Sequence, residues 1–527
     1  MTPTSYRSYR PLAALGLVAA LLVYILGCSR QADTPGKVAS PSQAAPNTAN
    51  PSPDDSKLFA DWPTPVGALL ISGEQDGYLE PCGCTSGQLG GLRRRYDLIR
   101  RIRDQKWPLA LIDLGSLIKD PAGARGGFEQ AKIKFTVALK ALALLKYDAL
   151  ALSAEDLKIG VDEALAQFLN MGERPKLVVA NVTAPGFEST IQQSLRTSAG
   201  AIKIGITSII DPAAVEAIMD PAKDLLSVKA PDDSLPAVLA DLEKDTHVQV
   251  LLVQGPPGLA RTLAGKYPRF DIVVATSEVV VPPEEAEMLN DGKTMLISVG
   301  KKGQYVGVVG LFQDPKQKFR YRRLTLHNRL NDSAEPMHVL LDEEFQSMLK
   351  AVGVVENFPR RDYVNGVPGS EFAGAESCKS CHPNTFAKWA TTKHANAYQV
   401  LLEAPNGSRQ FDAECISCHT TGFEFHSGWR SAEQTPYLKG NQCENCHGPA
   451  SKHVAEPDNL DFRKAIARTA EAANRNRLCL QCHDEDNSPK FDFASYWGKV
   501  AHNKLDTYDN PKVHQGLPAK VAESSTK

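Results

Sequence analysis

Short apolar runs recur between residues 66 and 312, and stretches with helical spacing separate several of them. The apolar runs predict buried strands at 66–72, 109–114, 149–152, 177–180, 202–207, 248–253, 271–275, 295–299 and 305–312. The helical spacing predicts helices at 128–146, 161–170 and 235–244. Because strands that alternate with helices form sheets covered on both faces, we expect an α/β region with a largely parallel or mixed sheet.

The pattern changes before this region. Arg7 and Arg10 precede an uncharged, mostly apolar stretch at 11–26, which is short for a membrane span and typical of an export signal. The stretch ends in Gly27-Cys28, which resembles a bacterial lipobox, and the resemblance implies cleavage before Cys28 and a lipid on its thiol. An uncleaved helical anchor is the alternative. Both predict an exported, membrane-attached protein on the periplasmic or cell-surface side.

Composition sets the other boundaries. Residues 28–61 are rich in Pro, Ala and Ser and predict a disordered tether. We divide the chain into a signal peptide, this tether, an α/β domain, a connector and a last domain, at 1–27, 28–61, 62–335, 336–370 and 371–527. The basic segment 316–323 is predicted to begin as a loop, and 342–352 to form a short amphipathic helix. The net charge of −2 gives no reason to expect a nucleic-acid partner.

Four copies of the pattern Cys-x-x-Cys-His lie between residues 378 and 483. The pattern is the attachment site of a c-type haem: two thiols one helical turn apart bind the porphyrin, and the following His binds the iron. One copy has a chance of about 10⁻⁵ per position, so four cannot be accidental. The pattern predicts four covalently attached haems, held by Cys378, Cys381, Cys415, Cys418, Cys443, Cys446, Cys479 and Cys482, with proximal iron ligands His382, His419, His447 and His483. Zinc sites also use Cys-x-x-Cys pairs, but zinc has no use for a His after every second Cys.

Two cysteines remain after Cys28 and the haem thiols are set aside. Cys82 and Cys84 lie one residue apart in Glu80–Thr85, just after the first predicted strand. In an oxidising compartment two such thiols tend to close into a strained, labile disulfide. Three interpretations stay open: a structural disulfide, a redox-active dithiol that exchanges electrons with the haems, or a thiolate contact with a metal or a haem edge.

Several motifs of the α/β region stand in the order of a known family: Ile71–Gly77, Gly90–Leu92, Leu111–Gly115, Tyr147–Leu152, Ala180-Asn181, Lys203–Ile206 and Phe270–Val274. Through them residues 66–312 resemble the calcineurin-like metallophosphoesterases, in particular the 5′-nucleotidase group. The resemblance implies an α/β sandwich whose loops hold two metal ions. At the metal-ligand positions of that family this chain has Glu74–Gly77, Gly115-Ser116, Ala154–Asp156, Gln254 and Ala275–Glu278, without any His.

A dinuclear site needs bridging and terminal ligands for both cations. Without them we predict a pseudo-phosphoesterase that holds no dinuclear metal and is no phosphatase. A replacement site for a hard cation is the alternative for the four carboxylates Glu74, Asp76, Glu155 and Asp156. Solvated loop carboxylates are the simpler account.

Further His and aromatic residues accompany the four haem motifs, in Trp389, His394–Tyr398, Thr420–Phe423, Gly448–His453 and Tyr496–His502. With them, residues 371–505 resemble the tetrahaem cytochrome c-554 family. The resemblance implies short helices wrapped around stacked haems, with little regular core of their own. It also implies His394, His453 and His502 as distal iron ligands. Because His453 lies only six residues beyond His447, we expect it to cap a neighbouring haem.

One haem lacks a distal ligand in this assignment. We expect this to be the haem of Cys415–His419, because the resemblance allows one five-coordinate haem. His426 is the alternative sixth ligand for its iron. Neither His426 nor His514 matches a motif of the family. An iron with two His ligands can only pass electrons, whereas an open iron can bind a small molecule.

The leading hypothesis is therefore electron transfer by a membrane-tethered tetrahaem cytochrome, between donor and acceptor proteins that the sequence does not identify. Its phosphoesterase-like domain is expected to dock a redox partner. The alternatives are an oxidoreductase acting on hydroxylamine, nitric oxide or nitrite at one five-coordinate haem, and a dithiol oxidoreductase using Cys82 and Cys84.

Overall fold

The computed structural model describes residues 58–81, 87–219, 226–314, 317–331, 335–404, 408–502 and 505–506. The chain divides into two compact units, Met1–Trp62 and Pro63–Lys527. In the first unit the rings of Phe59 and Trp62 pack with their centroids 4.9 Å apart. The predicted boundaries at 335/336 and 370/371 fall inside the second unit. The predicted signal peptide, Cys28 and most of the predicted tether lie outside the described residues.

The α/β region contains two large mixed sheets. The first has the order β15-β14-β1-β2-β3-β4-β6, built from Phe319–Thr325, Tyr305–Leu311, Gly67–Ser72, Leu109–Asp113, Ala149–Ala151, Lys176–Val178 and Ile191–Gln192. In this sheet β1, β2, β3, β4 and β6 run parallel, and β14 and β15 pair antiparallel at one edge.

The second sheet has the order β12-β13-β11-β10-β8-β7, built from Glu287–Leu289, Thr294–Ser298, Ile272–Ala275, Val248–Gln254, Ile202–Ile210 and Leu195–Ala199. Its four central strands are parallel, and both edge strands are antiparallel to their neighbours. A two-stranded ribbon pairs β5 (Val182–Thr183) with β9 (Ser227–Val228). The predicted mixed sheet is thus two sheets.

The main core lies between the two sheets. Leu69 and Ile71 of β1 join Val250 and Leu252 of β10 in one buried apolar cluster. Alternate residues of a strand point to opposite faces, so Leu251 of β10 enters a second cluster on the outer side of its sheet. Each sheet therefore buries both faces, as its continuous apolar runs predicted.

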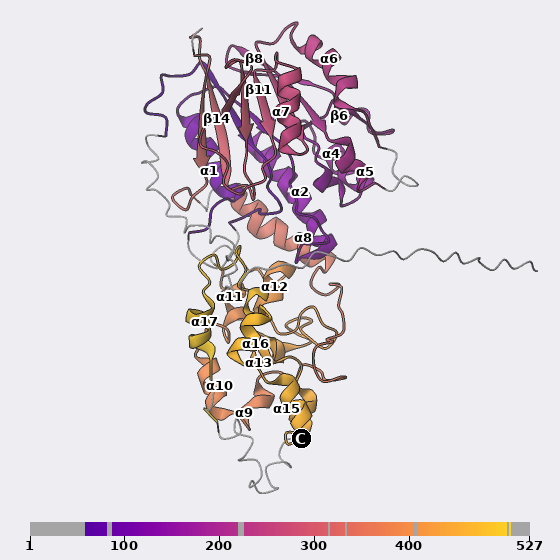
Figure 1. Ribbon diagram of the computed structural model, residues 1–527, viewed down its shortest axis with the longest axis vertical. Helices are drawn as coiled ribbons and strands as arrows, with labels where there is room; N and C mark the ends of the chain where they lie inside the picture. Colours follow the sequence, from indigo (N-terminus) through magenta and orange to yellow (C-terminus); the bar gives the residue numbers. More distant parts are fainter. Residues whose placement is uncertain are drawn as a thin grey trace, which may run out of the picture. The chain divides into compact units, whose positions relative to one another are not determined.

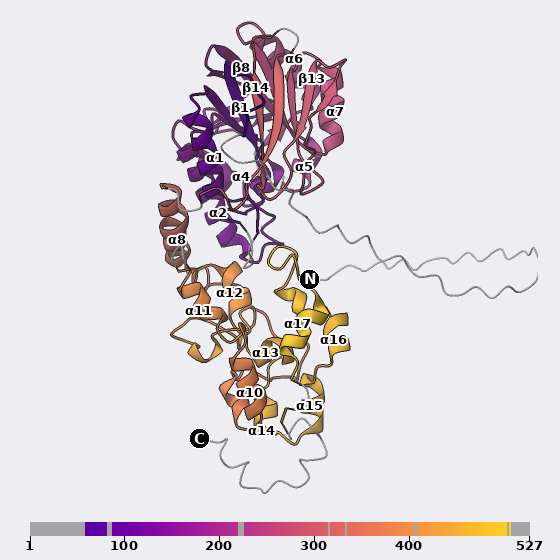
Figure 2. The same ribbon diagram turned by 90° about the vertical axis from the view of Figure 1, so that its left-hand side faces the viewer.

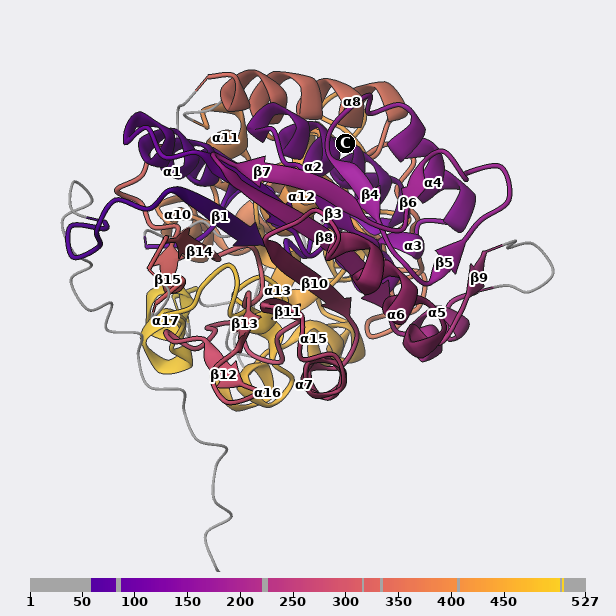
Figure 3. The same cartoon turned by 90° about the horizontal axis from the view of Figure 1, so that it is seen from above.

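Helices cover the outer faces of the sheets. α1 (Leu92–Asp104), α2 (Gly127–Leu145) and α4 (Val161–Leu169) lie along one side, and α6 (Pro231–Leu242) and α7 (Pro257–Lys266) along the other (Figure 3). α6 and α7 pack on the second sheet through Leu239, Leu242 and Leu263. α3 (Ala154–Leu157) and α5 (Pro212–Glu216) are single turns that follow strands β3 and β8. The arrangement is an α/β sandwich of four layers.

Two elements of this region were not predicted. The basic segment, which was predicted to begin as a loop, has no regular structure at 317–318 and continues from Phe319 as strand β15, paired antiparallel with β14. Arg323 of this strand lies over the ring of Tyr305 at 5.2 Å and pairs with Glu284. The strand was missed because its three Arg residues interrupt the apolar pattern by which buried strands are predicted. Helix α1 was not predicted, and its Arg93 and Arg95 are fully buried.

The rest of the second unit is helical. A π-helical turn, η2 (Val339–Glu344), runs into α8 (Phe345–Val352), which includes the predicted amphipathic helix. Beyond it come short helices: α9 (Glu376–Lys379), α10 (Pro383–Ala390), α11 (Ala397–Leu402), α12 (Ala413–His419), η3 (Pro436–Leu438), α13 (Cys443–His447), α14 (Ser451–Ala455), α15 (Leu460–Ile466), α16 (Ala470–Arg475), η4 (Leu478–Gln481) and α17 (Phe493–Val500). Figures 1 and 2 show these helices, in orange to yellow, joined by long connections. In the part of the chain that the structure describes, none of the helices has the length and apolar character needed to cross a membrane.

Candidate functional site

Each Cys-x-x-Cys-His motif forms about one helical turn. The motifs lie in α9 and the turn after it, at the end of α12, in α13, and in η4 and the residues after it. The backbone N–H of His382 donates to the carbonyl oxygen of Cys378 at 2.9 Å, and His483 repeats this contact with Cys479 at 2.8 Å. The turn brings both thiols and the following imidazole of a motif to one side of the chain, as haem attachment requires. Among the described residues, none of the eight thiols forms a disulfide.

The thiols also show which motifs are neighbours. The thiol of Cys443 in the third motif lies close enough to that of Cys378 in the first to lower the pKa of Cys378. In the same way, the thiol of Cys482 in the fourth motif lowers the pKa of Cys418 in the second. Because Cys446 of the third motif also interacts with Cys479 and Cys482 of the fourth, the helical region brings the motifs close together in the order first, third, fourth and second.

Two pairs of imidazole rings face one another across the same region. The ring centres of His394 and His483 lie 6.0 Å apart, and those of His447 and His502 lie 5.8 Å apart. A metal ion bound to an imidazole nitrogen at about 2 Å on each side would hold two ring centres about 6 Å apart. These two pairs fit axial ligation of one iron each. Each joins a His predicted as proximal to a His predicted as distal.

Hydrogen bonds fix the orientation of three predicted proximal rings. The Nδ1 atoms of His419 and His447 donate to the carbonyl oxygens of Ala397 at 2.5 Å and Ile466 at 2.7 Å. The Nδ1 atom of His483 lies 2.8 Å from the hydroxyl oxygen of Ser488. A proton held on Nδ1 leaves the lone pair of Nε2 for a metal, which is a common arrangement of His ligands.

Burial favours the neutral form of these rings. Desolvation lowers the pKa of His447 to about 4, and it also lowers the pKa values of His394, His419 and His483 below the ordinary range. A neutral imidazole is the form that binds a metal. The buried Nδ1 of His502 has no hydrogen-bond partner in the structure. The residues present therefore fit haem iron.

The structure separates other predicted residues from these pairs. His426, the tentative sixth ligand, is exposed, and its backbone N–H donates to the carbonyl oxygen of Arg361. His453 is half-buried in α14, and its assignment as a distal ligand stays a prediction. Cys82 and Cys84 lie outside the described residues, so all three interpretations of that pair stay predictions.

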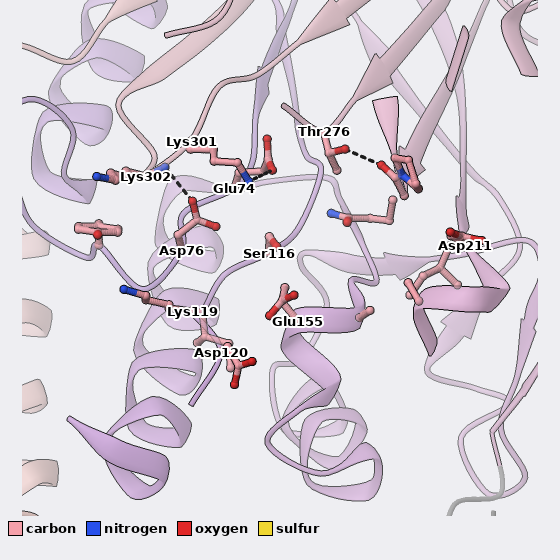
Figure 4. Close-up of a pocket in the computed structure, with 18 of the residues that line it drawn as sticks. Glu74, Asp76, Ser116, Lys119, Asp120, Glu155, Asp211, Thr276, Lys301 and Lys302 are labelled. Atoms are coloured by element: carbon pink, nitrogen blue, oxygen red, sulfur yellow. Dashed lines mark hydrogen bonds and ion pairs between the residues drawn. The ribbon is translucent and has the colours of Figure 1, made fainter. Parts of the chain in front are cut away.

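The second candidate site is a cleft in the sandwich. Loops after the carboxyl ends of β1, β2, β3, β10 and β11 surround a cavity of about 640 Å³. Figure 4 shows that Glu74, Asp76, Glu155 and Lys301 all face it. Parallel sheets commonly bind ligands at this edge. Asp486, three residues beyond His483, completes the lining from the helical region.

A lysine lies among the carboxylates that the sequence singled out. The ammonium of Lys301 contacts Glu74 at 3.1 Å and is attracted by Asp76 and Glu155. Burial raises the pKa of Glu74 to about 7 and that of Asp76 to about 6, and the charge of Lys301 opposes both shifts. Lys301 thus gives these acids a cationic neighbour.

The fourth carboxylate has a structural role. Asp156 is buried and accepts hydrogen bonds from the backbone N–H groups of Ser116, Leu117 and Ile118 at 2.8 to 3.1 Å. Gln254, at the position of a lone His ligand, donates its amide to the carbonyl oxygen of Leu114. In the described ranges, no group of three or more His, Cys, Asp or Glu residues is arranged to hold a metal ion. The residues present do not fit a dinuclear metal site.

Sequence reasoning missed Lys301 and the partners of the proximal His residues. Lys301 follows the carboxyl end of β13, and a Lys-Lys pair at the ligand edge of a parallel sheet was a usable signal. The groups that accept from the His Nδ1 atoms left no signal in the sequence, because two of them are backbone carbonyl oxygens, which every residue has.

Comparisons with known sequences fall on the helical region. The family model "Cytochrome c554 and c-prime" matches residues 377–448, and "Doubled CXXCH motif" matches residues 435–488. Cytochrome c-554 of Nitrosomonas europaea is 26% identical over 136 residues, which cover 21% of this chain and 57% of that protein. Multiheme cytochrome MtrA of Shewanella baltica is 24% identical over 135 residues, which cover 24% of this chain and 38% of that protein. The chain thus spans less than two thirds of either relative.

Solved structures similar to this chain include a 5′-nucleotidase precursor and a calcineurin-like phosphoesterase. A 5′-nucleotidase precursor from Thermus thermophilus aligns with a TM-score of 0.46 at 15% identity, covering 64% of this chain and 66% of its own. The calcineurin-like phosphoesterase YfkN from Bacillus subtilis aligns with a TM-score of 0.44 at 17% identity, covering 54% of this chain and 98% of its own. The family models confirm the predicted resemblance of the C-terminal part to multihaem cytochromes c with covalently bound haem c. The N-terminal part has the predicted α/β sandwich fold.

Proposed function

We propose that this protein is an exported, membrane-tethered c-type cytochrome with four haems that transfers electrons between partner proteins. When bound, haem iron takes up and releases one electron at a time. The eight Cys residues of the four motifs would attach the haems. The proximal iron ligands would be His382, His419, His447 and His483. Distal ligation falls to His394, His453 and His502.

The two axial pairs of imidazoles carry this proposal. His394 with His483, and His447 with His502, stand at the separation that one iron between them needs. An iron held on both sides has no free position for a substrate, so it serves electron transfer. His453 is the remaining predicted distal ligand, and we assign it to His382, because the first and third motifs are neighbours.

Haem content and electron paramagnetic resonance of the oxidised holoprotein test the proposal. We expect four haems per chain and low-spin signals from the irons of the first, third and fourth motifs. His394→Ala and His502→Ala should each convert one iron to high spin, because each removes one distal ligand. His426→Ala is the matched control and should change no signal. A low-spin spectrum unaltered by both ligand variants would refute the axial assignment.

A second candidate function concerns the haem of the second motif. His426, the sixth ligand suggested for this haem, is exposed and therefore does not face a buried site. An open iron here would make the protein an oxidoreductase for a small nitrogen compound, as predicted. A high-spin signal in the unmodified protein that disappears when nitric oxide binds would favour this function. Low-spin signals from all four irons would exclude it.

We infer that the sandwich does not hydrolyse phosphoesters, since its cleft holds a lysine where a dinuclear site needs cations. Nucleotide hydrolysis by the purified protein with added Mn²⁺ would overturn this inference. That the sandwich docks a redox partner, and that lipidated Cys28 anchors the chain, stay predictions. Labelling with radioactive palmitate, compared between the native chain and Cys28→Ala, tests the anchor.

A further inference from the structure

The sandwich reaches the second haem motif through helix α2 and the turn before it. The carboxylate of Asp412 caps α12, and the amide of Gln130 donates to it at 2.7 Å. The backbone N–H of Ala413 donates back to Gln130 at 2.9 Å. One helical turn further along α2, Lys134 forms an ion pair of 2.5 Å with Glu414. The sandwich therefore holds the start of the helix that carries the second motif.

Arg125 extends this contact to the haem attachment itself. This residue lies in the turn just before α2. One arm of its guanidinium donates to the sulfur of Cys418 at 2.9 Å, and the other contacts the carboxylate of Asp484 at 2.7 Å. Cys418 attaches the predicted second haem, and Asp484 directly follows His483, the predicted proximal ligand of the fourth. One fixed positive charge thus lies beside an attachment cysteine of the second motif and beside the residue that follows the predicted proximal ligand of the fourth.

The fourth motif is held from the sandwich at a further point. Asp486 accepts from the hydroxyl of Tyr78 at 2.6 Å and forms an ion pair with Lys302. By contrast, the third motif is held by its own region. Glu444 of α13 accepts hydrogen bonds from the backbone N–H groups of Gly374 at 2.8 Å and Ala450 at 2.9 Å. These contacts from the sandwich thus reach the second and fourth motifs.

We propose that the sandwich tunes the electron affinity of the haems on the second and fourth motifs, with Arg125 as the positioning residue that supplies the charge. Reduction of a ferric haem adds one negative charge to it, so a nearby cation stabilises the reduced form. Removing the guanidinium would also leave Asp484 beside these haems without its ion-pair partner. Both effects lower the reduction potential. The inference rests on the proposed attachment of four haems.

Redox titration of the holoprotein, followed by haem absorbance, tests this role in Arg125→Gln, Arg125→Lys and Lys140→Gln. Lys140 is the matched control: it also lies on α2, but it pairs with Glu344, away from the haem motifs. At the native midpoint, we expect Arg125→Gln to raise the oxidised-to-reduced ratio of two haems about tenfold. The other two haems should not shift. Arg125→Lys keeps the charge and should restore most of the potential, and Lys140→Gln should shift none.

Distal-ligand variants identify the haems that shift. His394→Ala gives the haem of the fourth motif its own high-spin signal, and His502→Ala does the same for the third. Adding Arg125→Gln should lower the reduction potential of the haem on the fourth motif and leave that of the haem on the third motif unchanged. Equal shifts of all four haems, no shift, or an equal effect of Lys140→Gln would overturn the inference. A missing high-spin signal, or fewer than four haems per chain, would instead count against the proposed ligation or attachment, which the same samples measure separately.

Discussion

The sandwich and the helical region use different material for their interiors. In the sandwich, apolar side chains of two sheets fill one continuous core, and the outer helices bury apolar faces on it. In the helical region, helices α10, α14, α15 and α17 bury no side chain completely, although α10 and α17 carry Trp389 and Trp497. The difference teaches that apolar side chains fill the sandwich throughout, whereas the helical region has a smaller core, around Trp429 and Phe423, that these four helices do not join.

Buried polar groups differ in the same way. In the sandwich, the buried guanidinium of Arg95 lies 3.4 Å from the buried carboxylate of Asp113, so charge is compensated within the protein. In the helical region the half-buried ring of His447 has its Nδ1 atom bonded to the carbonyl oxygen of Ile466 at 2.7 Å and makes no ion pair with any acid among the described residues. Such a ring keeps its second nitrogen for a partner that is not an amino acid.

Preventing haem attachment should have the largest effect. We expect the chain produced without haem to keep a folded sandwich, while residues 371–506 lose stable structure, because coupled metallo-domains fold only with their group. Hydrogen exchange read by mass spectrometry should show slow amides in β1 and β10 but fast amides in α12 and α13. The holoprotein is the control. Equal protection of α13 with and without haem would contradict the comparison.

A core truncation in the sandwich comes next. Ile71→Ala removes a fully buried side chain between the sheets, and we expect a loss of about 2–5 kcal/mol of unfolding free energy. Urea unfolding followed by far-ultraviolet circular dichroism measures it. Phe128→Ala, at an exposed position on α2, is the control and should change the value by less than about 0.5 kcal/mol. If Ile71→Ala also shifted the haem reduction potentials, packing in the sandwich and the electron affinity of the helical region would be coupled, which would contradict the comparison.

The sequence was most informative where chemistry fixes spacing. Haem attachment needs two thiols and a His within one helical turn, so the four motifs were predicted residue by residue. Which two His residues face one another depends on how distant segments pack. Nothing in the sequence near His502 indicates that its ring lies opposite that of His447. Strands with apolar runs, such as β1 and β10, were predicted closely. Helix α1 was missed because its first turn is Leu-Arg-Arg-Arg, and the burial of Arg93 and Arg95 depends on acids elsewhere in the chain.

The pH dependence of the sandwich gives a finer test. Burial, against the attraction of Lys301, raises the pKa of Glu74 from 4.5 in the unfolded chain to about 7. The folded state therefore holds its proton more tightly, and this contribution to stability is present below pH 4.5 and is lost as the pH rises to about 7. Asp76 and Asp156, whose pKa values are also raised by burial, act in the same direction.

Substituting this acid should flatten the pH profile. We expect Glu74→Gln to reduce the fall in unfolding free energy between pH 4.5 and about pH 8 by up to about 3 kcal/mol. Glu287→Gln, which changes an exposed ion pair with Arg261, is the control and should leave the profile as it is. Thermal melting of the strand signal across this range measures both. A profile in Glu74→Gln as steep as in the native chain would sink the expectation.

The smallest expected effect tests how firmly the two regions hold each other. Two lysines of α2 make ion pairs of different burial: Lys134 is 12% exposed and pairs with Glu414 of the haem-bearing helix α12, whereas Lys140 is 41% exposed and pairs with Glu344. Because exposed pairs are screened by water, Lys140→Gln should cost about 0–0.5 kcal/mol. Lys134→Gln should cost about 1–2 kcal/mol, since a charge-assisted hydrogen bond away from water is stronger. A double-mutant cycle with Glu414→Gln isolates the pair, read by urea unfolding of the holoprotein at the haem absorbance. A coupling energy near zero would mean that Gln130 and Arg125, rather than this ion pair, hold α12 to the sandwich.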